Sequence, residues 1–177
     1  MSKKARKMLG DWQSPYIRSL MELIETQSKI TIAGWCLDYT EENILPIYEK
    51  TFPDDSRPRS ALNAARDWFA GKVKLPEVKH IILNECHAAA REAENHPAAQ
   101  AAARACGQSA SCAHTPTHSL GMAFYGFAAI AYDRVGINES SEVYEKIAAE
   151  ECAKMYAALH KIMVPNEPNP ARIKWNC

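Results

Sequence analysis

The sequence predicts an all-α protein, a single-domain bundle of about seven helices around one buried central helix. Only seven of the 177 residues are glycine, and alanine is abundant between Ala88 and Ala131, a composition that favours helix. Apolar side chains recur every three or four residues along most of the chain. The only strand-like stretch, residues 29–35, has no second stretch with the same alternation, so we interpret it as part of a helix.

Two helices are predicted in the first fifty residues. The first covers about residues 15–27, with Ser14 as its cap and Pro15 at the first helical position, where proline is favoured. The second covers about residues 30–50. It is expected to kink near Pro46, because the proline ring removes a hydrogen-bond donor and crowds the preceding turn.

Three more helices are predicted between residues 55 and 107. Asp55 or Ser56 can cap the third, and Gly71 suits the left-handed position after its end. The fourth covers about residues 76–94, and the fifth covers about residues 97–107. The polar side of the fourth helix carries His80, Asn84, His87 and Arg91.

The predicted central helix covers about residues 116–133. A residue before proline is pushed out of the helical conformation, so Thr115 is expected to cap a helix that begins at Pro116. Apolar side chains cover most of its circumference, which is typical of a helix enclosed by others. A last amphipathic helix is predicted from Ser140 or Ser141 to about residue 163.

Composition excludes several classes of protein. No repeat or charge block divides the chain, so residues 1–177 are expected to form one domain with irregular tails at 1–13 and 164–177. The 21 Lys and Arg residues equal the 21 Asp and Glu residues in number, which predicts no nucleic-acid or anionic-membrane partner. We recognise no signal peptide, and the most apolar stretch, 119–132, is shorter than the about 20 residues of a membrane span. A cytoplasmic location follows, with six reduced cysteines, four of them buried and Cys177 exposed.

The segment CGQSASCAHTPTHSL, residues 106–120, holds two cysteines and two histidines. On an unbroken helix His114 and His118 would share a face, a spacing that metal ligands use. Zinc needs four ligands, or three and a water, so this pair is half a site that His87 or a carboxylate would have to complete. Cys112 could join only if the chain turns. The favoured interpretation is that both histidines lie at the edge of the core, satisfied by hydrogen bonds, and that no metal is bound.

Nine charged or ionisable residues are candidates for a binding site: Asp54, Asp55, Arg57, Arg59, Arg66, His87, Arg91, His114 and His118. The pattern at 54–59 sets two carboxylates close to two guanidinium groups. The simpler interpretation is a helix cap with surface ion pairs of little net stability. The alternative is a polar pocket in which arginine forks hold a carboxylate or a phosphate. Spacing alone favours the simpler interpretation.

No pattern typical of an enzyme is recognised. The chain has no glycine-rich phosphate loop and no nucleophile elbow, and it lacks both the His-x-Glu and the Pro-Cys-x-x-Cys signatures of zinc deaminases. We therefore predict no catalytic residue, no cofactor and no enzymatic activity.

Several motifs occur in a characteristic order: Asp-Asp-x-Arg-Pro-Arg (54–59), Arg66 with Trp68, His87-Ala-Ala-Ala-Arg91, Gly107-Gln108, and His114-x-Pro-Thr-His118-x-x-Gly121. On these motifs the chain resembles the small helical proteins known as putative immunity proteins of bacterial polymorphic toxin systems. The resemblance covers about residues 35–133. It implies a protein that binds a cognate toxin in the cytoplasm and blocks it without catalysis. Segments outside the motifs, up to residue 34 and at the C-terminus, could carry a partner-specific surface.

Three hypotheses follow. The first is a stoichiometric toxin-binding protein. The second is a helical protein that binds a small molecule or a metal through seven of these residues, which would then converge on one cleft: Asp54, Arg59, Arg66, His87, Arg91, His114 and His118. The third makes the same residues an internal polar network that fixes the register of the helices. The sequence does not indicate an oligomeric state.

Overall fold

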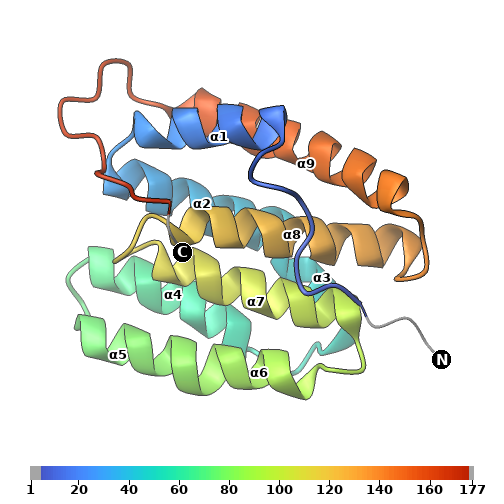
Figure 1. The fold of residues 1–177 in the computed structure, drawn as a ribbon. Helices are drawn as coiled ribbons and strands as arrows, with labels where there is room; N and C mark the ends of the chain where they lie inside the picture. The colour runs from blue at the N-terminus through green and yellow to red at the C-terminus, as the bar shows by residue number, and fades with distance from the viewer. Residues whose placement is uncertain (1–4, 176–177) are drawn as a thin grey trace.

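Helices account for all the regular structure of residues 5–175, which the computed structural model describes (Figure 1). The first four residues of the predicted N-terminal tail, and Cys177, which is predicted to be exposed, lie outside this range. The elements are α1 (Pro15–Glu25), α2 (Lys29–Asn43), α3 (Leu45–Thr51), α4 (Arg57–Phe69), α5 (Leu75–His80), the π-helical η1 (Ile81–Cys86), α6 (His87–Glu92), α7 (Pro97–Ser111), α8 (His118–Val135) and α9 (Ser141–Ile162). Because α2 runs into α3, and α5 into η1 and α6, these elements form the seven predicted rods. The all-α class is confirmed.

Several helix boundaries follow the local sequence. The Ser28 and Ser140 hydroxyls accept the backbone N–H groups of Thr31 and Val143, which caps α2 and α9. Gly71 has a φ of +71°, the left-handed conformation predicted for the residue after α4. The expected break near Pro46 is confirmed at Ile44, between α2 and α3.

Ser14 is the N-cap residue of α1, as predicted, although its side chain makes no capping hydrogen bond and its hydroxyl donates to Glu145 on α9. Two predicted boundaries are wrong. The helix predicted to end near Gly107 continues to Ser111. Gly107 does not terminate the helix but allows the His87 ring to pack closely against it. The central helix begins at His118 and not at Pro116, because turns over residues 112–117 reverse the chain.

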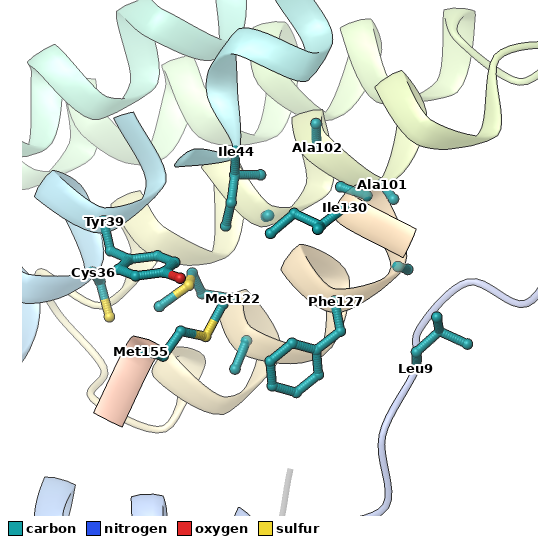
Figure 2. Packing of buried hydrophobic residues seen from close by; sticks show 14 of the residues in the cluster. Leu9, Cys36, Tyr39, Ile44, Ala101, Ala102, Met122, Phe127, Ile130 and Met155 are labelled. Carbon is teal, nitrogen blue, oxygen red and sulfur yellow. The ribbon is translucent and has the colours of Figure 1, made fainter. Parts of the chain in front are cut away.

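The core is built around α7 and α8 together. No residue from 97 to 132 is exposed, so the predicted burial of the central helix is confirmed. The preceding helix α7 is equally enclosed, and packs against α2, α3, α4, η1, α6 and α8. Figure 1 shows α7 and α8 between α1 and α9 on one side and α5 and α6 on the other. In Figure 2, Met122, Phe127 and Ile130 of α8 lie close to Ile44 and Met155 in the core.

The described terminal segments, residues 5–13 and 163–175, contain no helix, and both are attached to the bundle. Leu9 is buried, and its backbone N–H donates to the Phe124 carbonyl of α8 at 3.2 Å. At the other end, the Ala171 N–H donates to the Gln27 carbonyl at 2.8 Å. Figure 1 shows the N-terminal segment crossing α8 and the C-terminal segment ending beside the start of the same helix.

Two further predictions concern cysteines and membranes. The five cysteines within the described range are all buried free thiols, one more than expected in the core. In that range, no helix combines the length and the apolar character that crossing a bilayer requires.

Candidate functional site

Charged side chains from α2, α3 and α4 form a row that we call the charged ladder: Asp38, Arg66, Glu41, Arg59 and Glu49. Arg59 donates from Nε and Nη2 to both Glu49 oxygens, at 2.6 and 2.9 Å, and from Nη1 to Glu41 at 2.9 Å. Arg66 Nη2 lies 2.9 Å from Asp38 Oδ1 and 2.7 Å from Glu41 Oε2. Two-pronged contacts of this kind are the strongest that a guanidinium makes with a carboxylate. The ladder therefore fills the Arg59 fork, and occupies Nη2 of Arg66, with carboxylates of the chain itself.

Arg57, the first residue of α4, connects the loop before it to the end of α6. Its Nε and Nη2 donate to Asp55 at 2.9 and 2.7 Å, and its Nη2 also donates to Glu92 at 2.6 Å. The Tyr48 hydroxyl donates to Asp55 at 2.5 Å. Hydrogen bonds from Arg57 and Tyr48 outweigh the effect of burial and lower the pKa of Asp55 to about 2. Asp54 is exposed, so only one of the two adjacent aspartates joins the arginines.

A second polar group, the histidine cluster, consists of His87, Gln108, His114 and His118. His87 follows η1, where its own N–H bonds to the Ile82 carbonyl five residues back. The extra residue in this wide turn rotates α6 relative to α5 and brings the His87 ring against α7. His118, at the start of α8, pairs with α7 through its Nδ1, which lies 2.8 Å from Gln108 Oε1.

Two glycines make this packing possible. A Cβ at Gly107 would lie 2.8 Å from Cε1 of His87, closer than real Cβ atoms approach, and a tight 3.2 Å from its Nδ1. A Cβ at Gly121 would overlap the Gln108 side chain, with its Cδ at 2.9 Å. The motifs on which the resemblance rests at 87–91, 107–108 and 114–121 thus meet in one place.

Burial disfavours the charged form of the imidazoles in the cluster. Burial lowers the pKa of all three, with further lowering by Arg91 and Arg104 at His87 and by His118 at His114. His114 Nδ1 is buried without a hydrogen-bond partner among the described residues. A Gln108 oxygen can only accept, so His118 Nδ1 carries the proton and its Nε2 is an acceptor.

The geometry at the histidines is not that of a complete metal site. The rings of His114 and His118 are 5.9 Å apart between centroids, and Gln108 engages His118 Nδ1. Although the chain turns after it, Cys112 points back along α7, where its thiol donates to the Gln108 carbonyl at 3.4 Å. Within residues 5–175, no three His, Cys, Asp or Glu side chains are grouped to hold a metal ion.

A cavity of about 360 Å³ opens beside His118. It lies between α7, α8 and the two terminal segments. Its lining consists of Met8, Gln108, Thr117, His118, Leu120, Gly121, Phe124, Tyr125 and Trp175. Trp175 packs against the core, and its indole N–H donates to Glu25. The cavity joins polar groups of the histidine cluster to aromatic side chains.

The nine predicted residues do not converge on one cleft. Asp55, Arg57, Arg59 and Arg66 pair with carboxylates or an arginine around α4, while His87, His114 and His118 gather between α6, α7 and α8. Arg91 is exposed and forms no ion pair with a described residue. Sequence reasoning omitted the acidic half of the ladder, although Asp38 and Glu41 stand three apart on α2, on one face of the helix.

Comparison with known proteins gives one finding. The family model described as "Imm-5 like putative immunity protein" matches residues 22–158, more than three quarters of the chain. No curated protein and no solved structure matches the chain.

Proposed function

The chain belongs to the family of Imm-5 like putative immunity proteins, and we propose from this membership that it binds a cognate bacterial toxin and neutralises it. In this proposal it acts in the cytoplasm as a stoichiometric partner, without catalysis. The match over residues 22–158 is the observation that carries the proposal. It includes the ladder and the histidine cluster, both of which are assembled from the family-matched helices.

An exposed apolar patch supports a protein partner and suggests where it docks. Ile30, at the start of α2, is 71% exposed, and Phe69, at the end of α4, is 39% exposed. Together with Trp68 they line a groove of about 560 Å³, whose other wall is the C-terminal segment around Arg172. Contiguous exposed apolar side chains of this kind are typical of interaction sites.

The charge around this groove specifies the partner further. Lys29 and Arg172 line it, and neither forms an ion pair with a described residue. No acidic residue of residues 5–175 lines it. We therefore propose that the toxin inserts an apolar side chain between Ile30 and Phe69, with carboxylates beside it that meet the two cations.

The test uses the purified chain and an inactivated form of the toxin encoded beside its gene. We expect a one-to-one complex by light scattering, and loss of toxin activity when equimolar chain is added to the active enzyme. Ile30→Asp should weaken binding by about 30-fold or more, the loss expected at a central contact. Leu83→Asp is the matched control, since Leu83 is 57% exposed and lies on η1, away from the groove.

Two outcomes separate the function from the surface. If the wild-type chain neither binds nor inhibits the toxin, the proposed function is wrong. If it does both, but Ile30→Asp and Leu83→Asp bind equally well, the function holds and the proposed groove is wrong. Self-association of the chain through the groove would also contradict the docking surface.

A further inference from the structure

The cavity beside His118 has the properties of a small-molecule site that is independent of toxin binding. Its volume of about 360 Å³ lies within the roughly 300–1,000 Å³ of ligand pockets. One part of its lining is polar, from Gln108, Thr117 and His118, and the rest is apolar or aromatic. This combination of an apolar wall and a few convergent polar groups is typical of ligand sites.

The polar part has hydrogen-bonding groups to spare. The Thr117 hydroxyl is buried and has no partner among the described residues. Gln108 uses its carbonyl oxygen on His118, and its NH₂ group makes no hydrogen bond within the same range. His118 is left with Nε2 as an acceptor. The Gln108 NH₂ group is therefore the free hydrogen-bond donor that the cavity offers a ligand.

The remaining lining selects for shape and charge. Phe124, Tyr125 and Trp175 contribute three aromatic rings, which favour a flat aromatic guest. No Asp, Glu, Lys or Arg of residues 5–175 lines the cavity, so an ionised ligand would lose its hydration without gaining an ion pair.

We propose that this cavity binds a neutral, flat aromatic molecule that carries an amide. The amide C=O accepts a hydrogen bond from the Gln108 NH₂ group. The neutral amide accepts this bond without the loss of hydration that an ionised carboxylate would suffer, and a hydrocarbon cannot accept it.

Benzamide is the probe for this site. Titration of the full chain with benzamide, followed by amide chemical shifts, should give a saturable Kd of about 0.1–1 mM, which is reasonable for so few atoms. Shifts should centre on residues 117–125. Benzoate has the same shape with a charge, and acetamide has the amide without the ring, so each should bind about tenfold more weakly or worse.

Two variants and a control locate the binding. Gln108→Leu should weaken benzamide binding about tenfold, the loss of one hydrogen bond. Because this change also removes a partner of His118, Trp175→Ala provides a second test on a segment outside every helix, with a weakening of about threefold to tenfold. Trp12→Ala is the matched control, since Trp12 is 52% exposed, lies in the other terminal segment and does not line the cavity.

The proposal is overturned if benzamide binds no more tightly than benzoate, if its shifts map away from α8, or if the two tryptophan variants bind it equally. None of these measurements involves a toxin. A failure here therefore leaves the proposed immunity function untouched, and a failure of toxin binding leaves this site untouched.

Discussion

Replacing Gly107 with alanine tests the packing on which the histidine cluster depends. Alanine in the interior of a helix normally stabilises a protein by about 0.5–1 kcal/mol relative to glycine. In α7, however, the new Cβ would lie 2.8 Å from the His87 ring, so the imidazole must move. Overpacking of this kind costs about 1–3 kcal/mol. We expect Gly107→Ala to be less stable than the wild type by up to about 2 kcal/mol.

Gly34 is the matched control, because it lies inside α2 and a Cβ there meets nothing within 4 Å. Gly34→Ala should gain the full helix-propensity term, so the two variants should differ by about 1–3 kcal/mol. Urea unfolding followed by circular dichroism measures this difference. In thermal melts each kcal/mol should appear as about 2–4 °C for a chain of this size.

A double-mutant cycle identifies the cause. With His87→Ala in the background, the Gly107→Ala change should become stabilising, because the atom that it would meet has gone. If Gly107→Ala stabilises the wild-type chain as much as Gly34→Ala does, the imidazole does not occupy that place. The account of the cluster would then be wrong.

Three other predictions concern charge. Asp55→Asn removes the carboxylate held by Arg57 and should lower the free energy of unfolding by about 1–2 kcal/mol at pH 7. In urea unfolding, the difference in stability between the wild type and this variant should be present above the unfolded pKa of 3.8 and should disappear as the pH falls through about 2. Arg134→Met removes one of the cations paired with Glu151, whose side chain is only 3% exposed. This change should lower the stability measured in thermal melts by about 1–3 kcal/mol. The control Lys50→Met removes an exposed ion pair and should cost less than about 1 kcal/mol. Because burial lowers the pKa of the histidines of the cluster, stability in urea should be full above pH 6.5 and fall as the pH drops through their folded pKa, since the unfolded chain takes up protons first.

Local chemistry made much of the fold predictable. Proline at a first helical position, the kink near Pro46 and the left-handed Gly71 each depend on residues within one turn, and each lies where the sequence predicts. The sequence also predicted that α8 is enclosed by other helices, because apolar side chains cover most of its circumference. Where a residue's role depends on a distant partner, prediction failed. Gly107 resembles a helix end in the sequence, but its reason for being glycine is an imidazole twenty residues earlier.

In the candidate site, too, local contacts were predictable from the sequence and contacts between distant elements were not. Spacing correctly indicated that Arg57 and Asp55 would pair, because they are two residues apart. It could not indicate that Arg59 would turn to Glu49 and Glu41, since that contact requires the relative placement of three helices. The π-helical turn before His87 has no simple sequence signature, yet it decides which side of α6 faces the cluster.

The C-terminal segment connects the two proposed surfaces. The family match ends at residue 158, and the segment that follows contributes Arg172 to the groove and Trp175 to the cavity. In each case the opposite wall comes from helices inside the match, around Phe69 for the groove and around His118 for the cavity. If both proposals hold, the matched helices supply a shared framework, and the residues beyond it complete each surface. Selectivity for one toxin or one ligand would then depend in part on Arg172 and Trp175, two side chains that the family match does not include.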